Sequence, residues 1–261
     1  MVAPLFFAPT LAATTAGATV LLDCDEGKHA ANVRRMRVGE DIQLTNGLGL
    51  RVIGKVAGVS PGVVEIAVDQ VASEAPAELQ ITLVQALAKN DRDEMAIQAA
   101  TELGVNRVIP WQSTRSIVRW DAAKAPKAVA RWQSIVDEAA KQSMRSHRVS
   151  VDLPMTTPQL AALIAEGQFD QILVLAPTGS QVFDPNAVKS SGRLCLVVGP
   201  EGGIDESELA ALSAKGAKLV TLGANILRTS TAGPAVIAAI RFGKLAGPRH
   251  AQLGASAPEQ N

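Results

Sequence analysis

The segment LVVGPEGGID, residues 196–205, is the stretch whose residue types and spacing point most clearly to chemistry. An apolar run leads into a loop of Gly and Pro, and in α/β sheets ligands collect where the carboxyl ends of strands open into such loops. Glycine lets the backbone approach a ligand more closely than a larger side chain would allow. The loop matches neither GxGxxG nor a P-loop, so nicotinamide or ATP binding has no motif support. It indicates a ligand site of another kind, or a structural turn.

A second stretch, LGANILRTSTAG at residues 222–233, repeats this order of apolar run, loop and helix start. It places one permanent cation, Arg228, between apolar residues and a Ser/Thr run. An arginine in such a setting is rarely unpaired, so Arg228 either forms an ion pair with a carboxylate or contacts a charged ligand. A third loop, residues 175–180, also follows an apolar run. Together these loops predict a binding site more strongly than one loop alone.

Basic residues gather in two places, although the net charge is zero. The first group consists of Lys28, His29, Arg34, Arg35 and Arg37, and the second of Arg131, Lys141, Arg145 and Arg148. Such groups suit contacts with nucleic-acid phosphates, while a solvated surface is the other explanation of a short charge cluster. No aromatic platform of the RRM type accompanies them. An RNA-binding surface is therefore one of two open interpretations.

The cysteines and histidines argue against metal and nucleophile chemistry. Cys24 and Cys195 lie far apart, and the three His are isolated, so neither a disulfide framework nor a zinc site is expected. No GxSxG elbow is present. The N-terminal stretch is a poor signal peptide, and no run of ~18 apolar residues could cross a membrane. These features predict a cytoplasmic protein without a metal or a membrane partner.

The elements that must position these loops change in character along the chain. Before residue 73, short runs with period-two alternation predict strands separated by turns such as Asn46-Gly47, with one helical patch over His29–Arg37. The pattern in this half predicts a small β-barrel or sandwich. A polar segment, SEAPAE at 73–78, follows it as the expected linker. The expected strands are Thr19–Asp23, Asp41–Leu44, Leu50–Val56 and Val63–Val71.

After Gln80 the pattern alternates between strands and helices. Apolar runs without alternation, such as LCLVV, are typical of strands buried on both faces of a mostly parallel sheet. Asp91 with Glu94, and Asp205 with Glu208, predict capping boxes at two helix starts. The expected strands are 81–86, 105–111, 171–176, 194–198 and 219–222, and the expected helices begin at Asp91, Ala123, Leu160, Asp205 and Ala235.

Taken together, these segments resemble the RsmE family, the 16S rRNA uridine-N3 methyltransferases of the SPOUT superfamily. The matching pieces are HAANVRRMRVGE at 29–40, ALAKNDRDEMAIQAATELGVNRVIPWQSTRS at 86–116, RWQSIVDEAAKQSMR at 131–145, LVVGPEGGIDESEL at 196–209 and LGANILRTSTA at 222–232. The resemblance implies an α/β protein with an N-terminal PUA-like, RNA-binding small β-barrel over 1–72. A linker over 73–80 then leads to a SPOUT α/β domain, 81–248, with a deep trefoil knot. Residues 249–261 are expected to be a disordered tail.

The resemblance also implies where the site lies. The family's pocket for S-adenosylmethionine is made by the knot loops, its members are homodimers, and the pockets lie near the subunit interface. Arg228 is the expected catalytic residue, and the expected RNA contacts are His29, Arg34, Arg35 and Arg37. The expected cofactor-binding residues are Leu175, Ala176, Pro177, Val198, Gly199, Pro200, Glu201, Gly202, Gly203, Ile204, Leu222, Gly223, Ile226, Leu227, Thr229, Ser230, Thr231 and Ala232.

The implied reaction is methylation of N3 of a specific uridine in 16S rRNA of the small ribosomal subunit. A sulfonium methyl is already activated, so the main task is to align it with N3. A fixed cation such as Arg228 would stabilise charge on the base carbonyl oxygens as N3 loses its proton.

Two departures from the family pattern and two alternatives accompany this reading. Many relatives carry Glu where this chain has Ser230, and Arg where it has Leu5. The alternatives are a related methyltransferase acting on tRNA or a ribose hydroxyl, and a non-catalytic ribosomal RNA-binding assembly factor.

Overall fold

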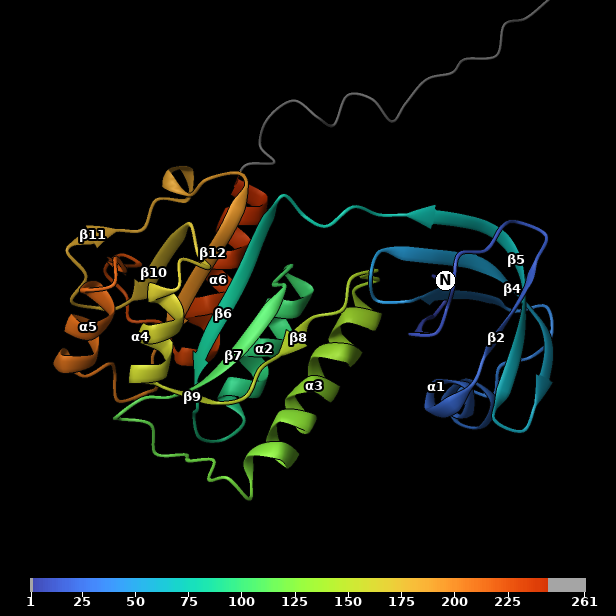
Figure 1. The fold of residues 1–261 in the computed structure, drawn as a ribbon, viewed down its shortest axis with the longest axis horizontal. Coiled ribbons are helices and arrows are strands. Elements are labelled where there is room, and N and C mark those ends of the chain that lie inside the picture. The colour runs from blue at the N-terminus through green and yellow to red at the C-terminus, as the bar shows by residue number, and fades with distance from the viewer. Residues whose placement is uncertain (1, 244–261) are drawn as a thin grey trace, which may run out of the picture.

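A computed structural model describes residues 2–243 and arranges them around two separate sheets (Figure 1). The first sheet has five strands in the order β1-β3-β4-β5-β2. Its centre is the long hairpin of β4, Leu50–Ser60, and β5, Val63–Ser73. Alternate residues point into one core, where Val52, Val56 and Ile66 pack with Ile42, as period-two patterning predicts. The other strands are β1, Leu5–Phe7, β2, Thr19–Leu22, and β3, Asp41–Thr45.

The helical patch of this half differs from the expected one. It consists of two consecutive turns, α1 over Cys24–Lys28 and the π-helical turn η1 over His29–Val33. The expected helix over His29–Arg37 is wrong at both ends. Arg35 has a left-handed φ of 53°, which ends helical geometry before Arg37.

The second sheet is parallel throughout and has the order β11-β13-β10-β12-β6-β7-β8, with β9 also paired to β7. The mostly parallel sheet expected from the apolar runs is therefore present. Its strands are β6, Leu79–Ala86, β7, Arg107–Gln112, β8, Ser150–Val151, β9, Met155–Thr156, β10, Gln171–Leu175, β11, Gln181–Val182, β12, Gly192–Val198, and β13, Lys218–Thr221.

Helices cover both faces of this sheet (Figure 1). Strand β12 shows why its residues are apolar without alternation, because Leu196 lies in one core and its neighbours Cys195 and Val197 in the other. The first core is closed by α2, Arg92–Glu102, α3, Ala125–Gln142, and α6, Thr229–Gly243, and the second by α4, Thr157–Ala165, and α5, Glu206–Ser213. A short 3-10 turn, η2, spans Pro185–Ala187.

The helix starts predicted at Asp91, Ala123 and Asp205 agree closely with α2, α3 and α5, whereas α4 begins at Thr157 instead of Leu160. The Asp205–Glu208 capping box is present at α5. The Asp91–Glu94 box is absent, because Asp91 has a left-handed φ of 55° and its side chain makes no capping hydrogen bond. Helix α6 begins at Thr229 instead of Ala235, so Thr229 to Thr231 form its first turn instead of preceding it.

Helix α6 also packs inward. Its apolar residues Val236, Ile237 and Ile240 are buried against the sheet, while Phe242 is 54% exposed. The apolar face of α6 therefore belongs to the core of the second sheet. The expected tail over 249–261 lies outside the described residues.

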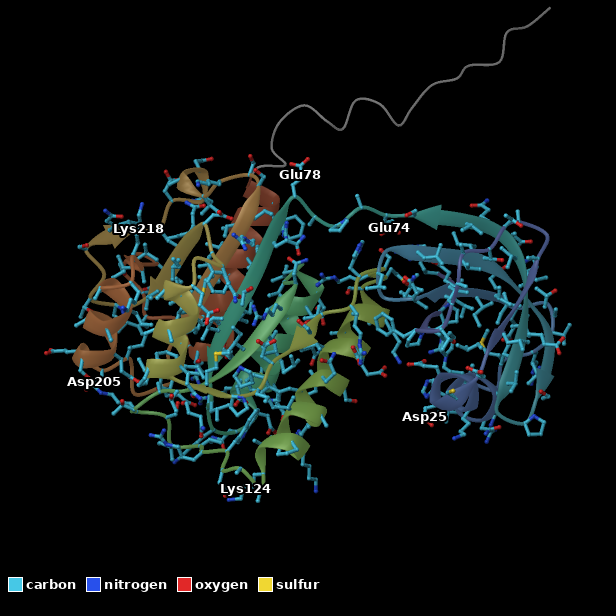
Figure 2. The ribbon with its side chains drawn as sticks, viewed as in Figure 1. Asp25, Glu74, Glu78, Lys124, Asp205 and Lys218 are labelled. Atoms are coloured by element: carbon cyan, nitrogen blue, oxygen red, sulfur yellow. The ribbon has the colours of Figure 1, made fainter. Side chains whose placement is uncertain are left out.

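The two sheets meet where the chain leaves α3 (Figure 1). Residues 146–148 run along residues 47–49, with Gly49 N–H donating to Ser146 O and Arg148 N–H donating to Gly47 O. The Arg51 guanidinium donates to Met144 O at 2.6 Å and to Glu74 at 2.6 Å. Figure 2 labels Glu74 at this junction and Glu78 where the chain enters β6. Backbone pairing therefore ties the first sheet to the end of α3.

Candidate active site

Two adjoining cavities open at the carboxyl ends of the parallel strands. The first, of about 290 Å³, lies between the loops after β10 and β13 and is mainly apolar. The second, of about 410 Å³, lies between the loop after β12 and the start of α6. Both are lined by Leu175, Pro177, Ile226, Leu227 and Ala232, so the cavities share a wall. Concave, largely apolar sites with a few polar groups are typical of small-molecule binding.

Close contact between the loops explains two of their glycines. A Cβ on Gly179 would lie 2.6 Å from the carbonyl carbon of Val220, and one on Gly199 would lie 2.5 Å from Ile204 Cγ1. Both distances are shorter than side-chain atoms tolerate. Gly179 therefore lets the loop after β10 pack against β13, and Gly199 lets the GPEGG loop fold tightly on itself, because glycine lacks a Cβ.

Arg228 lies on the wall of the second cavity and is exposed. Its backbone carbonyl accepts hydrogen bonds from the N–H groups of Thr231 and Ala232, at the first turn of α6. Within residues 2–243 the Arg228 guanidinium has neither a hydrogen-bond partner nor an ion-pair partner. The structural alternative, an Arg held by a carboxylate, is therefore not what the structure shows, and the cation remains available to a ligand.

The structure gathers most of the predicted cofactor-binding residues at these cavities. Ser230 and Thr231 do not line either cavity, because they lie on the first turn of α6 and its cavity side is taken by Thr229 and Ala232. Sequence reasoning missed further lining residues, Val220, Thr221, Ala224, Asn225 and Arg92. The four from the β13 segment adjoin predicted residues. Arg92 comes from a different loop, so nothing in the three motifs could have indicated it.

Thr229 joins the second and third loops at the base of the second cavity. Its hydroxyl donates to Gly199 O at 2.7 Å and accepts from the Gln85 side-chain amide at 2.8 Å. Thr229 is 5% exposed and Gln85 fully buried, so water cannot replace these bonds. Central strand β6 therefore holds both cavity loops through one hydroxyl group.

Replacing Thr229 by Val should lower the free energy of unfolding by about 1–3 kcal/mol, the cost of leaving buried polar partners unsatisfied. Ser230→Ala is the matched control, because Ser230 is a neighbouring hydroxyl with no side-chain hydrogen bond within the described part of the chain. It should change stability by no more than about 0.5 kcal/mol. Urea unfolding of both variants checks this, and equal midpoints would contradict the role assigned to Thr229.

The loop after β7 supports the GPEGG loop from outside. The Arg115 guanidinium donates to Gly202 O at 3.3 Å and to Asp205 at 3.2 Å. Hydrogen bonds from Ser207, together with Arg115, hold the pKa of the Asp205 carboxyl below its ordinary value. Glu208, 4% exposed, accepts from Thr114 N–H at 2.8 Å. The helix that follows GPEGG is thereby fixed to the loop after β7.

The predicted RNA-contact residues lie on the first sheet's side of the molecule. His29 and Arg34 line a cavity of about 420 Å³ that also includes Lys141 and Gln142 of α3. Arg35 and Arg37 do not line it, but both are exposed. None of the three arginine side chains has a hydrogen-bond or ion-pair partner among the described residues. Their charges are therefore open to solvent.

The side chains of the second basic group all have partners within the protein, either carboxylates or backbone carbonyls. Arg131 pairs with Glu94, Lys141 with Glu26 at 2.7 Å, and Arg148 with Asp137. Arg145 donates to the carbonyl of Thr101 at 2.8 Å and to that of Val105, and burial lowers the pKa of its guanidinium to about 10. These residues hold α3 in place, so the phosphate-contact interpretation of this group is not supported.

Residues 2–243 contain neither a metal-binding cluster nor a membrane-spanning helix. No group of at least three His, Cys, Asp or Glu side chains could hold a metal ion. No helix there has the length and apolar character needed to cross a membrane.

Comparison with known proteins relates this architecture to RNA methyltransferases. Residues 75–241 match the RNA methyltransferase domain family, and residues 21–69 match the RNA methyltransferase PUA domain family. The chain is 40% identical to ribosomal RNA small subunit methyltransferase E of Mycobacterium bovis, over 92% of each chain. It is 33% identical to the Bacillus subtilis protein of the same name, over 84% of this chain and 88% of the relative.

A solved structure agrees over nearly the whole length. Ribosomal RNA small subunit methyltransferase E from Neisseria gonorrhoeae, bound to S-adenosyl methionine, aligns with a TM-score of 0.78 and 30% identity, covering 93% of this chain and 98% of that one. Matches to both domain families and to full-length relatives confirm the resemblance noted from the motifs. The chain belongs to the ribosomal RNA small subunit methyltransferase E family.

Proposed function

We propose that the protein transfers the methyl group of S-adenosylmethionine to N3 of one uridine in 16S rRNA of the small ribosomal subunit. The observation that carries this is the pair of joined cavities at the strand ends, one apolar and one bearing the unpaired Arg228. The apolar cavity suits a flat adenine ring, and the adjoining second cavity has room for the methionine part of the cofactor and for the acceptor base. S-adenosylmethionine would supply an activated methyl group.

The chain's own residues then have two tasks. The three loops hold the two reactants in line and exclude water, which lowers the entropic part of the barrier. As N3 loses its proton to solvent water, Arg228 donates to a carbonyl oxygen of the base, where fixed positive charge is most effective.

The decisive experiment uses S-adenosylmethionine with a radiolabelled methyl group and small subunits from cells that lack this enzyme. Label in N3-methyluridine of 16S rRNA is the expected result. Label in tRNA or in a 2′-O-methyl nucleoside would favour the related methyltransferases instead. Tight binding to subunits without any transfer would favour the non-catalytic assembly factor.

Gly202→Val should weaken S-adenosylmethionine binding at least about tenfold. Gly202 lines the second cavity, and the added side chain would point toward Arg115 and displace the loop whose backbone must approach the cofactor. The fold should remain, because a Cβ on Gly202 would lie 3.4 Å from Arg115 Cβ, an ordinary contact. Titration calorimetry measures the affinity, and circular dichroism verifies the fold. Wild-type affinity in the variant would mean that the cofactor lies elsewhere.

We also infer a homodimer, supported by the family resemblance. Ile226, on the cavity wall, is 81% exposed, and Val182, on the edge strand β11, is 69% exposed. A partner subunit that covers them would complete the cavity wall. Light scattering should find a dimer at micromolar concentration, and Val182→Asp should shift it toward monomer. A monomer with full activity would contradict this.

Three further features stay predictions that the resemblance supports. They are the deep trefoil knot of a SPOUT domain, the closed PUA-like barrel, and the division at residues 1–72, 73–80 and 81–248. Cytoplasmic localisation follows from an rRNA substrate and stays a prediction as well.

A further inference from the structure

A second permanent cation lies on the cavity that holds Arg228. Arg92, the first residue of α2, lines that cavity together with Glu201 of the GPEGG loop. Its guanidinium is 3.8 Å from Glu201 Oε1 and its side chain is 30% exposed. Across the described residues this guanidinium donates no hydrogen bond. Arg92 therefore has donors free for a ligand that enters the cavity.

The backbone around Arg92 is fixed without help from its side chain. Asp93, 5% exposed, accepts from Ala88 N–H at 3.0 Å, and Glu201 accepts from Lys89 N–H at 3.2 Å. Burial raises the pKa of the Asp93 carboxyl. A cation in the first turn of a helix is electrostatically unfavourable, so helix stability does not account for an arginine at this position.

The chemistry of the acceptor base explains why one cation is not enough. When uracil N3 loses its proton, the negative charge spreads over the two carbonyl oxygens that flank N3. One guanidinium that bridged both oxygens would stand in front of N3 and block the incoming methyl group. Two guanidinium groups that each approach one oxygen leave N3 open, and each stabilises the developing charge.

We propose that Arg92 is a second catalytic residue, which donates to one carbonyl oxygen of the target uracil while Arg228 donates to the other. This inference rests on the proposed function. Glu201 keeps the Arg92 guanidinium at the cavity through a long ion pair. The entering base then takes donors that Glu201 does not occupy.

Single-turnover methyl transfer tests this with Arg92→Ala, Arg92→Gln and Arg92→Lys. The Ala and Gln variants should lose roughly 10²-fold in rate, as on removal of one donor to developing charge, and Lys should retain part of the rate. Affinity for S-adenosylmethionine should stay near wild type. The matched control is Arg193→Ala, because Arg193 is also an arginine in a single long ion pair, 3.5 Å from Asp170, but lies at the amino end of β12.

A substrate with a more acidic N3 separates charge stabilisation from phosphate binding or structure. Small subunits reconstituted with 5-fluorouridine in 16S rRNA need less help to ionise N3. The rate ratio of wild type to Arg92→Ala should therefore shrink at least several-fold on this substrate, and the Arg193→Ala ratio should not move.

Two results would overturn the assignment while wild-type enzyme is active. One is a wild-type rate in both Arg92→Ala and Arg92→Gln. The other is an unchanged ratio on the fluorinated substrate, which would make Arg92 a phosphate contact or a structural residue. Inactive wild-type enzyme on both substrates would instead refute the proposed function itself.

Discussion

Arg228→Ala is expected to slow methyl transfer to small ribosomal subunits about 10²–10³-fold, the usual cost of removing one preorganised donor to developing charge. Arg228 lies on the cavity wall with no partner among residues 2–243. Its removal therefore breaks no ion pair, and the loss should appear in the rate and not in stability. Affinity for S-adenosylmethionine should change much less than the rate.

Two variants sharpen this test. Arg228→Lys should recover little activity, because an ammonium group cannot reproduce the planar donor fork of a guanidinium. Arg193→Ala removes an equal charge far from the cavities and should keep the wild-type rate. A wild-type single-turnover rate for Arg228→Ala would make this residue structural. Loss of cofactor binding would assign it to the pocket and leave charge stabilisation to other residues.

Replacing Arg34, Arg35 and Arg37 together by Ala should weaken binding to the small subunit on the order of tenfold or more at physiological salt. Each phosphate contact contributes roughly 0.7–0.9 to the slope of log affinity against log salt concentration, so the slope should fall by roughly 2 to 3. The reason lies in the structure, where these arginines are exposed and unpaired among the described residues.

A control with the same loss of charge is available. Arg131, Arg148 and Arg193 each pair with a carboxylate, so their triple replacement by Ala should leave the salt slope almost unchanged. If both triple variants show the same slope as wild type, the exposed arginines are a solvated surface. Filter binding across a salt series is sufficient to distinguish these outcomes.

Strands and helices could be predicted most accurately where a segment is long enough to show a clear apolar pattern. Strand β12 has no polar residue from Leu194 to Val198 and is buried on both faces, so its place in a parallel sheet could be inferred. Strands β8, β9 and β11 have two residues each, which is too few for any period. The Asp91–Glu94 pattern was misleading, because the buried contact of Asp93 with Ala88 determined the backbone there.

The candidate site was predictable only as far as its motifs extend. The three loops are contiguous in sequence, and their apolar and glycine residues mark them. Arg92 reaches the second cavity from another strand end, and the Gln85–Thr229–Gly199 chain joins residues from three separate segments. Such contacts arise from tertiary packing, so no local pattern in one sequence records them.

The junction between the two sheets has a consequence for target choice. Residues 47–49 and 146–148 are paired through their backbones, and Thr45 Oγ1 also donates to Ser146 O at 2.8 Å. Helix α3 connects this joint to the sheet that bears the cavities. The exposed arginines of the first sheet's side are therefore held at a fixed distance from the two cavities. The enzyme would then select its target by distance. It would accept a uridine only where the folded RNA places a phosphate backbone at the matching distance from that uridine. Lengthening residues 75–78 alone would leave that separation unchanged, whereas a substitution at Gly49 that breaks the backbone pairing would make it variable.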